Sequence, residues 1–206
     1  TYVQACKINY LEKGDFAGVV HTGNGKKEGD DYKKPLCYLP LALDNSGGGQ
    51  VWVPKNSWGD LGGNLIHLSY GKSRAYTVFK EKVNGQVQGG VVELPIRLMS
   101  SGMRMRFNPA RPEEAIITGF KGWQTNASLT TAITRVRYKG NKMIRPVEVK
   151  ATTQGLYLTF NEALDPETLK NINNFSVERW NYLYSEQYGS AHFATDTAEN
   201  ILEEFK

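Results

Sequence analysis

Short apolar runs separated by tight-turn signals recur about every 8 to 12 residues from Val51 to Thr118. Gly71–Lys72 and Asn84–Gly85 stand between neighbouring runs and match the two-residue turns that join antiparallel strands. Strands of this length and spacing occur in the blades of β-propellers and in β-sandwiches. The pattern therefore predicts an all-β fold of antiparallel hairpins, although periodicity alone does not separate these two architectures.

One short strand alternates strictly between apolar and basic residues. Met103, Met105 and Phe107 would lie on one face of such a strand, with Arg104 and Arg106 on the other. We expect the three apolar side chains to be buried and the two arginines to reach solvent or pair with acids.

The pattern of apolar and polar residues changes after a polar connector at Gly122–Thr131, and we place a domain boundary there, between residues 125 and 126. Beyond it, Gly155–Phe160 and Phe175–Tyr184 have the pattern of strands, and a phase switch in the second predicts a bulge. Asp165–Pro166 predicts the start of a short helix, because Asp caps helices well and Pro is tolerated at their first position.

Composition argues against several functional classes. With 206 residues and 40% hydrophobic content, the chain can bury a sizeable core. The 25 Lys and Arg residues are spread along the chain and matched by 21 Asp and Glu, so the net charge of +4 does not predict nucleic acid as a partner. No stretch approaches the ~20 apolar residues that span a bilayer. The sequence starts without a Met or a signal peptide, and we expect a processed or truncated product.

The two cysteines, Cys6 and Cys37, are too far apart for Cys-x-x-Cys chemistry, and no haem-attachment motif is present. Two interpretations stay open. A disulfide would close the Gly- and Lys-rich loop between them, and the alternative is a pair of buried thiols.

A Gly-rich loop supplies the main candidate for ligand binding. Asp44, Asn45 and Ser46 offer oxygen atoms and hydrogen bonds, and the three glycines that follow would let a ligand approach the backbone. No Gly-Lys-Ser/Thr follows, so the loop is not a phosphate loop. The alternative interpretation is a strained turn between two strands.

Exposed tryptophans would be a second candidate, because an aromatic face can cover the apolar side of a sugar ring. Trp58 and Trp123 lie in Gly-rich segments typical of loops, whereas Trp52 and Trp180 have the pattern of core residues. We therefore select Trp58 and Trp123 as candidate contacts for carbohydrate.

The three histidines, His21, His67 and His192, are not at metal-ligand spacing from each other or from cysteines and carboxylate pairs. We predict no metal site. His67 alternates with apolar neighbours and is interpreted as a core or surface imidazole rather than as a general base.

Several segments resemble the late blades of bacterial secreted glucose/sorbosone-dehydrogenase-like β-propellers. They are LDNSGGGQVWV, WGDLGGNLIHLSYGKSRAYTVF, VNGQVQGGVVELP, SSGMRMRFNP and TGFKGWQTNA. The later segments RVRYKGNK and LTFNEALDPETLKNINNFSVERWNYLYSEQYGS resemble the immunoglobulin-like part that follows this propeller in large haem-binding-domain proteins of Planctomycetes and Bacteroidetes. The resemblance implies closing blades in residues 1–125 and an incomplete Ig-like module in residues 126–206.

Two functions follow as expectations from this resemblance. The first is a binding or scaffold module of an exported protein, periplasmic, secreted or at the cell surface, acting in carbohydrate-related processes. The alternative is a fragment of a sugar-dehydrogenase-like oxidoreductase that passes electrons to a cytochrome c domain outside this chain. We assign no catalytic residue and no cofactor to the chain, whereas haem c or pyrroloquinoline quinone would belong to the parent protein.

The strand count predicts incompleteness. The strands before Gly122 suffice for about two blades, and those after Thr134 fall short of the roughly seven of an Ig-like sandwich. We therefore expect the remainder of its precursor or a protein complex as the partner that covers the open faces of Val51–Leu94 and Phe175–Tyr184.

Overall fold

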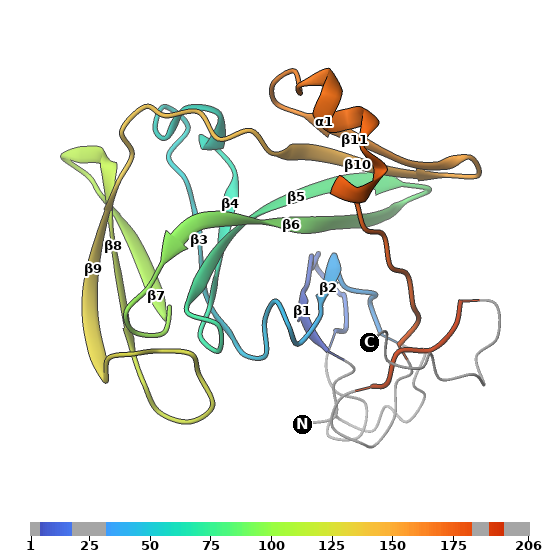
Figure 1. Ribbon diagram of the computed structural model, residues 1–206. Helices are drawn as coiled ribbons and strands as arrows, with labels where there is room; N and C mark the ends of the chain where they lie inside the picture. The colour runs from blue at the N-terminus through green and yellow to red at the C-terminus, as the bar shows by residue number, and fades with distance from the viewer. Residues whose placement is uncertain (1–4, 18–31, 183–189, 196–206) are drawn as a thin grey trace. The chain divides into compact units, whose positions relative to one another are not determined.

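The computed structural model describes residues 5–17, 32–182 and 190–195, and it is an all-β protein with antiparallel sheets (Figure 1). Strands account for 44% of the structure. The chain forms two compact units. One is continuous, Leu39–Ala163, and the other combines the two ends of the chain, Thr1–Tyr38 and Leu164–Lys206.

The continuous unit begins with a four-stranded antiparallel sheet of consecutive strands. These strands are β3 (Gly47–Trp52), β4 (Leu65–Ser69), β5 (Arg74–Val83) and β6 (Gln86–Arg97), and a 3-10 turn, η2 (Gly59–Leu61), lies between the first two. The two-residue turn predicted at Asn84–Gly85 is confirmed, since Val83 pairs with Gln86 across it. A hairpin also forms around Gly71–Lys72, but Ser69 pairs with Arg74, so its connection has four residues and not the predicted two. Asn84 and Gly85 have φ of 48° and 85°, the left-handed conformations that a two-residue hairpin turn requires.

A three-stranded antiparallel sheet follows, with β7 (Arg104–Asn108), β8 (Arg111–Phe120) and β9 (Thr131–Arg137) in that order. The polar connector placed at the domain boundary, residues 125/126, lies inside this sheet, because β8 and β9 pair from Glu114 with Arg137 to Phe120 with Thr131. The connector is thus a hairpin loop, and the compact units divide instead at 38/39 and 163/164. Polar composition is common to hairpin loops and interdomain linkers, so composition did not distinguish them.

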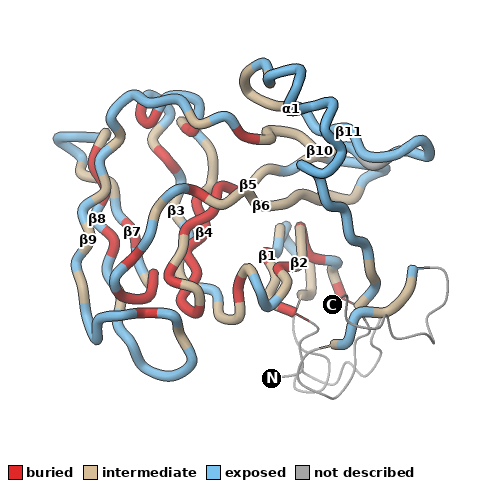
Figure 2. The backbone as a smooth tube through the Cα atoms, in the orientation of Figure 1, coloured by how far each residue is buried: buried red, intermediate tan, exposed pale blue. Residues whose placement is uncertain are grey.

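One hydrophobic cluster joins the two sheets. Its buried members are Val53, Trp58, Leu61, Ile66, Leu68, Ala75, Leu94 and Leu98 from the first sheet region, and Met105, Ala115 and Ile117 from the second. Figure 2 shows buried residues along β4, β7 and β8.

The expected alternation in β7 is confirmed. Met105 is buried and Met103 and Phe107 are half-buried, whereas Arg104 and Arg106 are exposed. Each apolar side chain of β7 therefore points to the core that it shares with the first sheet.

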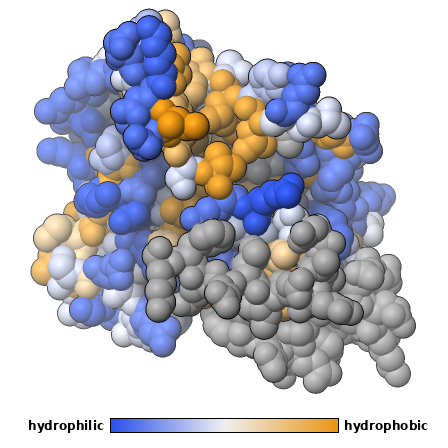
Figure 3. All heavy atoms as spheres, turned by 45° about the vertical axis from the view of Figure 1, so that its right-hand side comes forward, coloured by the Kyte–Doolittle hydropathy of each residue, from blue (hydrophilic) through white to orange (hydrophobic). Residues whose placement is uncertain are grey.

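The two remaining strands of this unit, β10 (Pro146–Thr152) and β11 (Gly155–Phe160), pair as a hairpin, as the sequence predicted for Gly155–Phe160. Leu156 and Leu158 are 51% and 45% exposed on β11. Figure 3 brings the side that carries this hairpin forward and shows hydrophobic residues at the surface there.

In the other unit, β1 (Cys6–Ile8) and β2 (Cys37–Leu39) form a two-stranded sheet, in which Leu39 is the first residue of the continuous unit. The predicted helix is confirmed as α1 (Pro166–Lys170), which is followed by the 3-10 turn η3 (Ile172–Asn174). The carboxylate of Asp165 accepts a hydrogen bond from the backbone N–H of Thr168 at 2.9 Å and caps this helix. None of the helices among the described residues is long and apolar enough to cross a membrane.

The strand predicted for Phe175–Tyr184 is wrong over its described part. Residues 175–182 contain only an isolated bridge, in which Asn181 and Phe193 exchange two backbone hydrogen bonds of 2.9 and 3.0 Å. Val177 is 71% exposed. Apolar alternation produces a strand only where a neighbouring strand lies alongside, and no neighbour is present for residues 175–180 within the described ranges.

Candidate functional site

The Asp44 carboxylate, first of the three loop candidates, is fully buried just before β3. Its Oδ1 accepts hydrogen bonds from the Ser69 hydroxyl at 2.5 Å and from the Ser46 backbone N–H at 3.1 Å. Its Oδ2 lies 2.8 Å from Nε2 of His67. These internal partners satisfy Asp44, so the structure places it as a support of the loop and not at a surface open to ligands.

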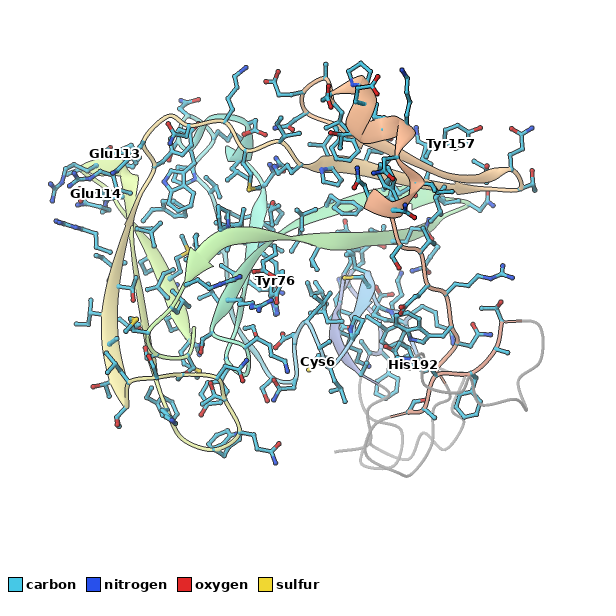
Figure 4. All side chains as sticks on the ribbon, viewed as in Figure 1. Cys6, Tyr76, Glu113, Glu114, Tyr157 and His192 are labelled. Carbon is cyan, nitrogen blue, oxygen red and sulfur yellow. The ribbon has the colours of Figure 1, made fainter. Side chains whose placement is uncertain are left out.

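His67 is buried in β4, as expected for a core imidazole, and shares one face of the sheet with Gln50 on β3 and Tyr76 on β5. Nδ1 of His67 lies 3.5 Å from Nε2 of Gln50. The Tyr76 hydroxyl donates to the carbonyl of Leu43 at 2.5 Å, and burial raises the pKa of this phenol. Figure 4 labels Tyr76 at the centre of this region.

The buried cluster contains the residue types of a Ser–His–Asp relay but not its order of contacts. In such a relay the imidazole lies between the serine and the carboxylate and takes the proton of the serine hydroxyl. Here the Ser69 hydroxyl donates to Asp44 directly, and a backbone N–H, that of Lys72, donates to Ser69 at 2.9 Å. The arrangement is that of a structural hydrogen-bond network.

Asn45 and Ser46 connect this loop to two other segments. The Ser46 carbonyl accepts hydrogen bonds from the backbone N–H groups of Tyr70 and Gly71 at 2.9 and 3.1 Å. The Asn45 side-chain amide donates to the carbonyl of Gln124 at 3.4 Å. The structure therefore brings the Asp44–Ser46 loop together with the neighbour of Trp123, although the two are about eighty residues apart.

The Trp123 indole is 69% exposed and packs on a base of two aromatic rings. The ring centroids of Tyr70 and Phe120 lie 5.4 and 6.4 Å from it. The Tyr70 hydroxyl accepts a hydrogen bond from the Gly122 N–H, and its carbonyl accepts one from the Thr125 hydroxyl, both at 2.8 Å. The connector that carries Trp123 is thus attached to the β4–β5 turn on both sides of the indole.

The other candidate tryptophan, Trp58, is buried, which contradicts its selection as an exposed loop residue. Its indole N–H donates to the carbonyl of Glu113 at 3.0 Å, and its ring packs against Phe107 and Tyr138. Glu113 lies near the start of β8 (Figure 4), and Phe120 is the last residue of that strand. Glycines on both sides of a short 3-10 turn had suggested a surface loop, but the turn folds back over the core.

The two tryptophans that the sequence placed in the core also differ from expectation. Trp52, at the end of β3, is 60% exposed. Trp180 is half-buried and its ring stacks on His192 at 4.3 Å between centroids. Trp52 is the last residue of β3.

Cys6 and Cys37 begin the two paired strands β1 and β2, and the structure contains no bond between their sulfurs. Both side chains are half-buried, closer to the buried-thiol interpretation than to the disulfide. Burial raises the pKa of the Cys37 thiol to about 12. His21 lies outside the described residues, and within the described part of the chain no three His, Cys, Asp or Glu side chains come together as metal ligands.

Sequence reasoning found Asn45 and Trp123 separately but missed the residues that join them, Tyr70 and Gln124. It also missed the partners of Asp44. The alternation of the sequence placed His67 on the opposite face of its strand from Ile66 and Leu68. Nothing in the sequence predicted its contact with Asp44, which forms only when the strands pair.

Comparison of the chain with protein-family models, with curated protein sequences and with solved structures finds no match.

Proposed function

We propose that this chain is a noncatalytic binding or scaffold module of an exported bacterial β-propeller protein, and that it binds carbohydrate at the Trp123 surface. We define the Trp123 surface as Trp123 with Asn45 and two exposed residues of the connector, Lys121 and Gln124. The exposed indole on its aromatic base is the observation that carries the proposal.

The arrangement of the two sheets supports the propeller part. Each sheet consists of consecutive antiparallel strands, and the two share one core, as neighbouring blades do. The first strand of the first sheet, β3, comes close to the residues that lead into β7, the first strand of the second sheet, because a Cβ added to Gly48 would lie 2.0 Å from the carbonyl oxygen of Gly102. Such an approach of first strands is expected around a propeller axis, and glycine alone permits it.

In this proposal the blades extend to β9, and β10 with β11 begins the Ig-like module. The exposed Leu156 and Leu158 of β11 support an incomplete module, because the apolar face of a two-stranded hairpin needs a covering layer. The rest of the precursor, or a protein complex, would supply that layer.

The chemistry of the Trp123 surface suits a sugar. An indole covers the apolar C–H face of a pyranose, while amide and ammonium groups beside it bond to the ring hydroxyls. Asn45, Lys121 and Gln124 provide such groups, and Lys121, Gln124 and Trp123 are exposed. The noncatalytic form is favoured over the sugar-dehydrogenase alternative because the buried side chains of His67 and Ser69 are hydrogen-bonded to Asp44.

Titration calorimetry of the chain with a panel of neutral and acidic oligosaccharides tests this proposal. Trp123→Ala should weaken binding by about tenfold or more, as the loss of a central aromatic contact does. Trp52→Ala is the matched control, since Trp52 is similarly exposed on β3, and it should bind as the wild type does. Equal affinity of the two variants, or no binding by any oligosaccharide, would reject the carbohydrate part of the proposal.

A further inference from the structure

The outer face of the β7–β9 sheet, opposite the shared core, presents three cross-strand rows of side chains. Strand register places Arg106, Ile116 and Arg135 in one row, Arg104, Thr118 and Ile133 in the next, and Glu114 beside Arg137 in the third. All of these residues except Glu114 are exposed. We call this surface the arginine face.

The arginine face carries most of the net charge of the chain. Four arginines against one glutamate leave a formal charge of +3 on this face, compared with +4 for all 206 residues. Glu114 is buried and engaged, since Nε of Arg137 donates to its Oε1 at 2.8 Å and Nη2 of Arg111 lies 3.3 Å from its Oε2.

The other three arginines of this face form no ion pair with an acidic side chain among the described residues. Arg104 and Arg106 each donate one hydrogen bond from Nη1, to the carbonyls of Met103 and Met105, both at 2.7 Å. A guanidinium has five N–H donors, so most of their donors remain available to a ligand. Arg135 completes the set from β9, the opposite edge strand of the sheet.

Large apolar side chains lie among these charges. Ile133 is 77% exposed and Ile116 36%. A surface that only interacts with water, or only with a polyanion, gains nothing from exposed isoleucines. Arginine mixed with apolar residues is instead the composition of protein interfaces.

We propose that the arginine face docks a protein surface on which carboxylates flank an apolar strip. Neighbouring strands lie about 4.8 Å apart, which places Arg106 and Arg135 roughly 10 Å from each other with Ile116 between them. The partner would therefore present two carboxylates at about this spacing, each able to take a bidentate arginine contact, with an apolar side chain over Ile116. This partner surface is distinct from the carbohydrate at the Trp123 surface.

A helical peptide that repeats Glu-Ala-Gln-Leu-Leu-Gln-Ala is a suitable probe, because its glutamates recur every 10.5 Å or so with leucines between them. Binding to the intact chain is measured by fluorescence anisotropy, with poly-glutamate, heparin and duplex DNA as comparison ligands. The expected result is binding of the peptide at least tenfold tighter than poly-glutamate of equal charge.

Variants separate charge from shape. Arg106→Glu with Arg135→Glu should lower peptide affinity by more than tenfold, whereas Lys55→Glu with Lys82→Glu, the same charge change at exposed sites elsewhere, should lower it less than threefold. Ile133→Ser should weaken peptide binding and leave poly-glutamate binding unchanged. A thermal melt of each variant confirms that it is folded.

Three outcomes would overturn the proposal. They are failure of the peptide to bind more tightly than poly-glutamate, equal loss with the Lys55 and Lys82 reversals, and tighter binding of heparin or DNA than of the peptide. The last outcome would identify the face as a polyanion site.

Discussion

Nε2 of His67 and Oδ2 of Asp44 lie 2.8 Å apart, and the two side chains are 5% and 0% exposed. This contact joins the loop before β3 to the centre of the first sheet. Through Ser46 and Asn45 the same loop reaches the β4–β5 turn and the connector of Trp123, so a buried polar contact positions part of an exposed surface.

Asp44→Ala should destabilise the chain by about 3–5 kcal/mol, because it leaves His67 and Ser69 buried without their acceptor. Urea unfolding followed by circular dichroism measures the change. Glu162→Ala removes an ion pair with Lys142 at the surface and should cost less than about 1 kcal/mol. An Asp44 variant as stable as the Glu162 variant would contradict the network described here.

Gly71→Ala should cost about 1–3 kcal/mol, because its added Cβ would lie 2.0 Å from Oδ1 of Asn45. In an Asn45→Ala background the same change should cost less, since the opposing side chain is gone. The comparison is a double-mutant cycle in urea. Additive effects would show that these residues do not touch.

Trp58→Ala should destabilise the chain by about 3–5 kcal/mol, as expected when a buried indole leaves a cavity and the Glu113 carbonyl loses its donor. Trp123→Ala removes a largely exposed indole and should cost under about 1 kcal/mol. Thermal unfolding of the two variants distinguishes them. If Trp123 proved the more costly, the assignment of core and surface to these two residues would be reversed.

Glu114 should make stability depend on pH in the acid range. Hydrogen bonding to Arg137 holds the pKa of this carboxyl below its usual value of 4.5. Its contribution is therefore fully present above that value and is lost as pH falls through the lowered pKa of the folded state. Unfolding free energies between pH 3 and 7 should fall more steeply toward acid in the wild type than in Glu114→Gln, and parallel curves would contradict this.

Cys37 should react slowly with alkylating reagents. A pKa of about 12, against the usual 9.0, lowers the thiolate fraction at pH 8 about a thousandfold. Iodoacetamide labelling followed by peptide mass spectrometry measures the rate, with a short cysteine peptide as the reference. A rate equal to that of the peptide would show that the thiol is accessible and not desolvated.

Local features were well predicted where the deciding interactions lie close together in the chain. The turn at Asn84–Gly85, the cap at Asp165 and the alternation around Met105 each depend on neighbours within a few residues. The strand predicted for Phe175–Tyr184 failed because a strand also needs a partner, and a single segment contains no information on what lies beside it.

The candidate site was predicted only in pieces. Asn45 and Trp123 were both singled out, but nothing in the sequence placed them near each other, and Trp58 was indistinguishable from Trp123 in its Gly-rich setting. The arginine face shows the same limit, since Arg104 and Arg106 form a basic surface only together with Arg135, which lies on another strand.

By itself the sequence determined the antiparallel all-β class, the turn at Asn84–Gly85 and the buried face of β7, because a period of two and glycine-dependent turns are properties of the local chain. The tertiary structure alone decided which tryptophan is buried, which polar groups satisfy Asp44, and that β9 pairs with β8 across a connector resembling a linker. The physical reason is that burial and hydrogen bonding at these positions come from residues far away in sequence, which the chain brings together only when its strands pair and its two sheets close over a common core.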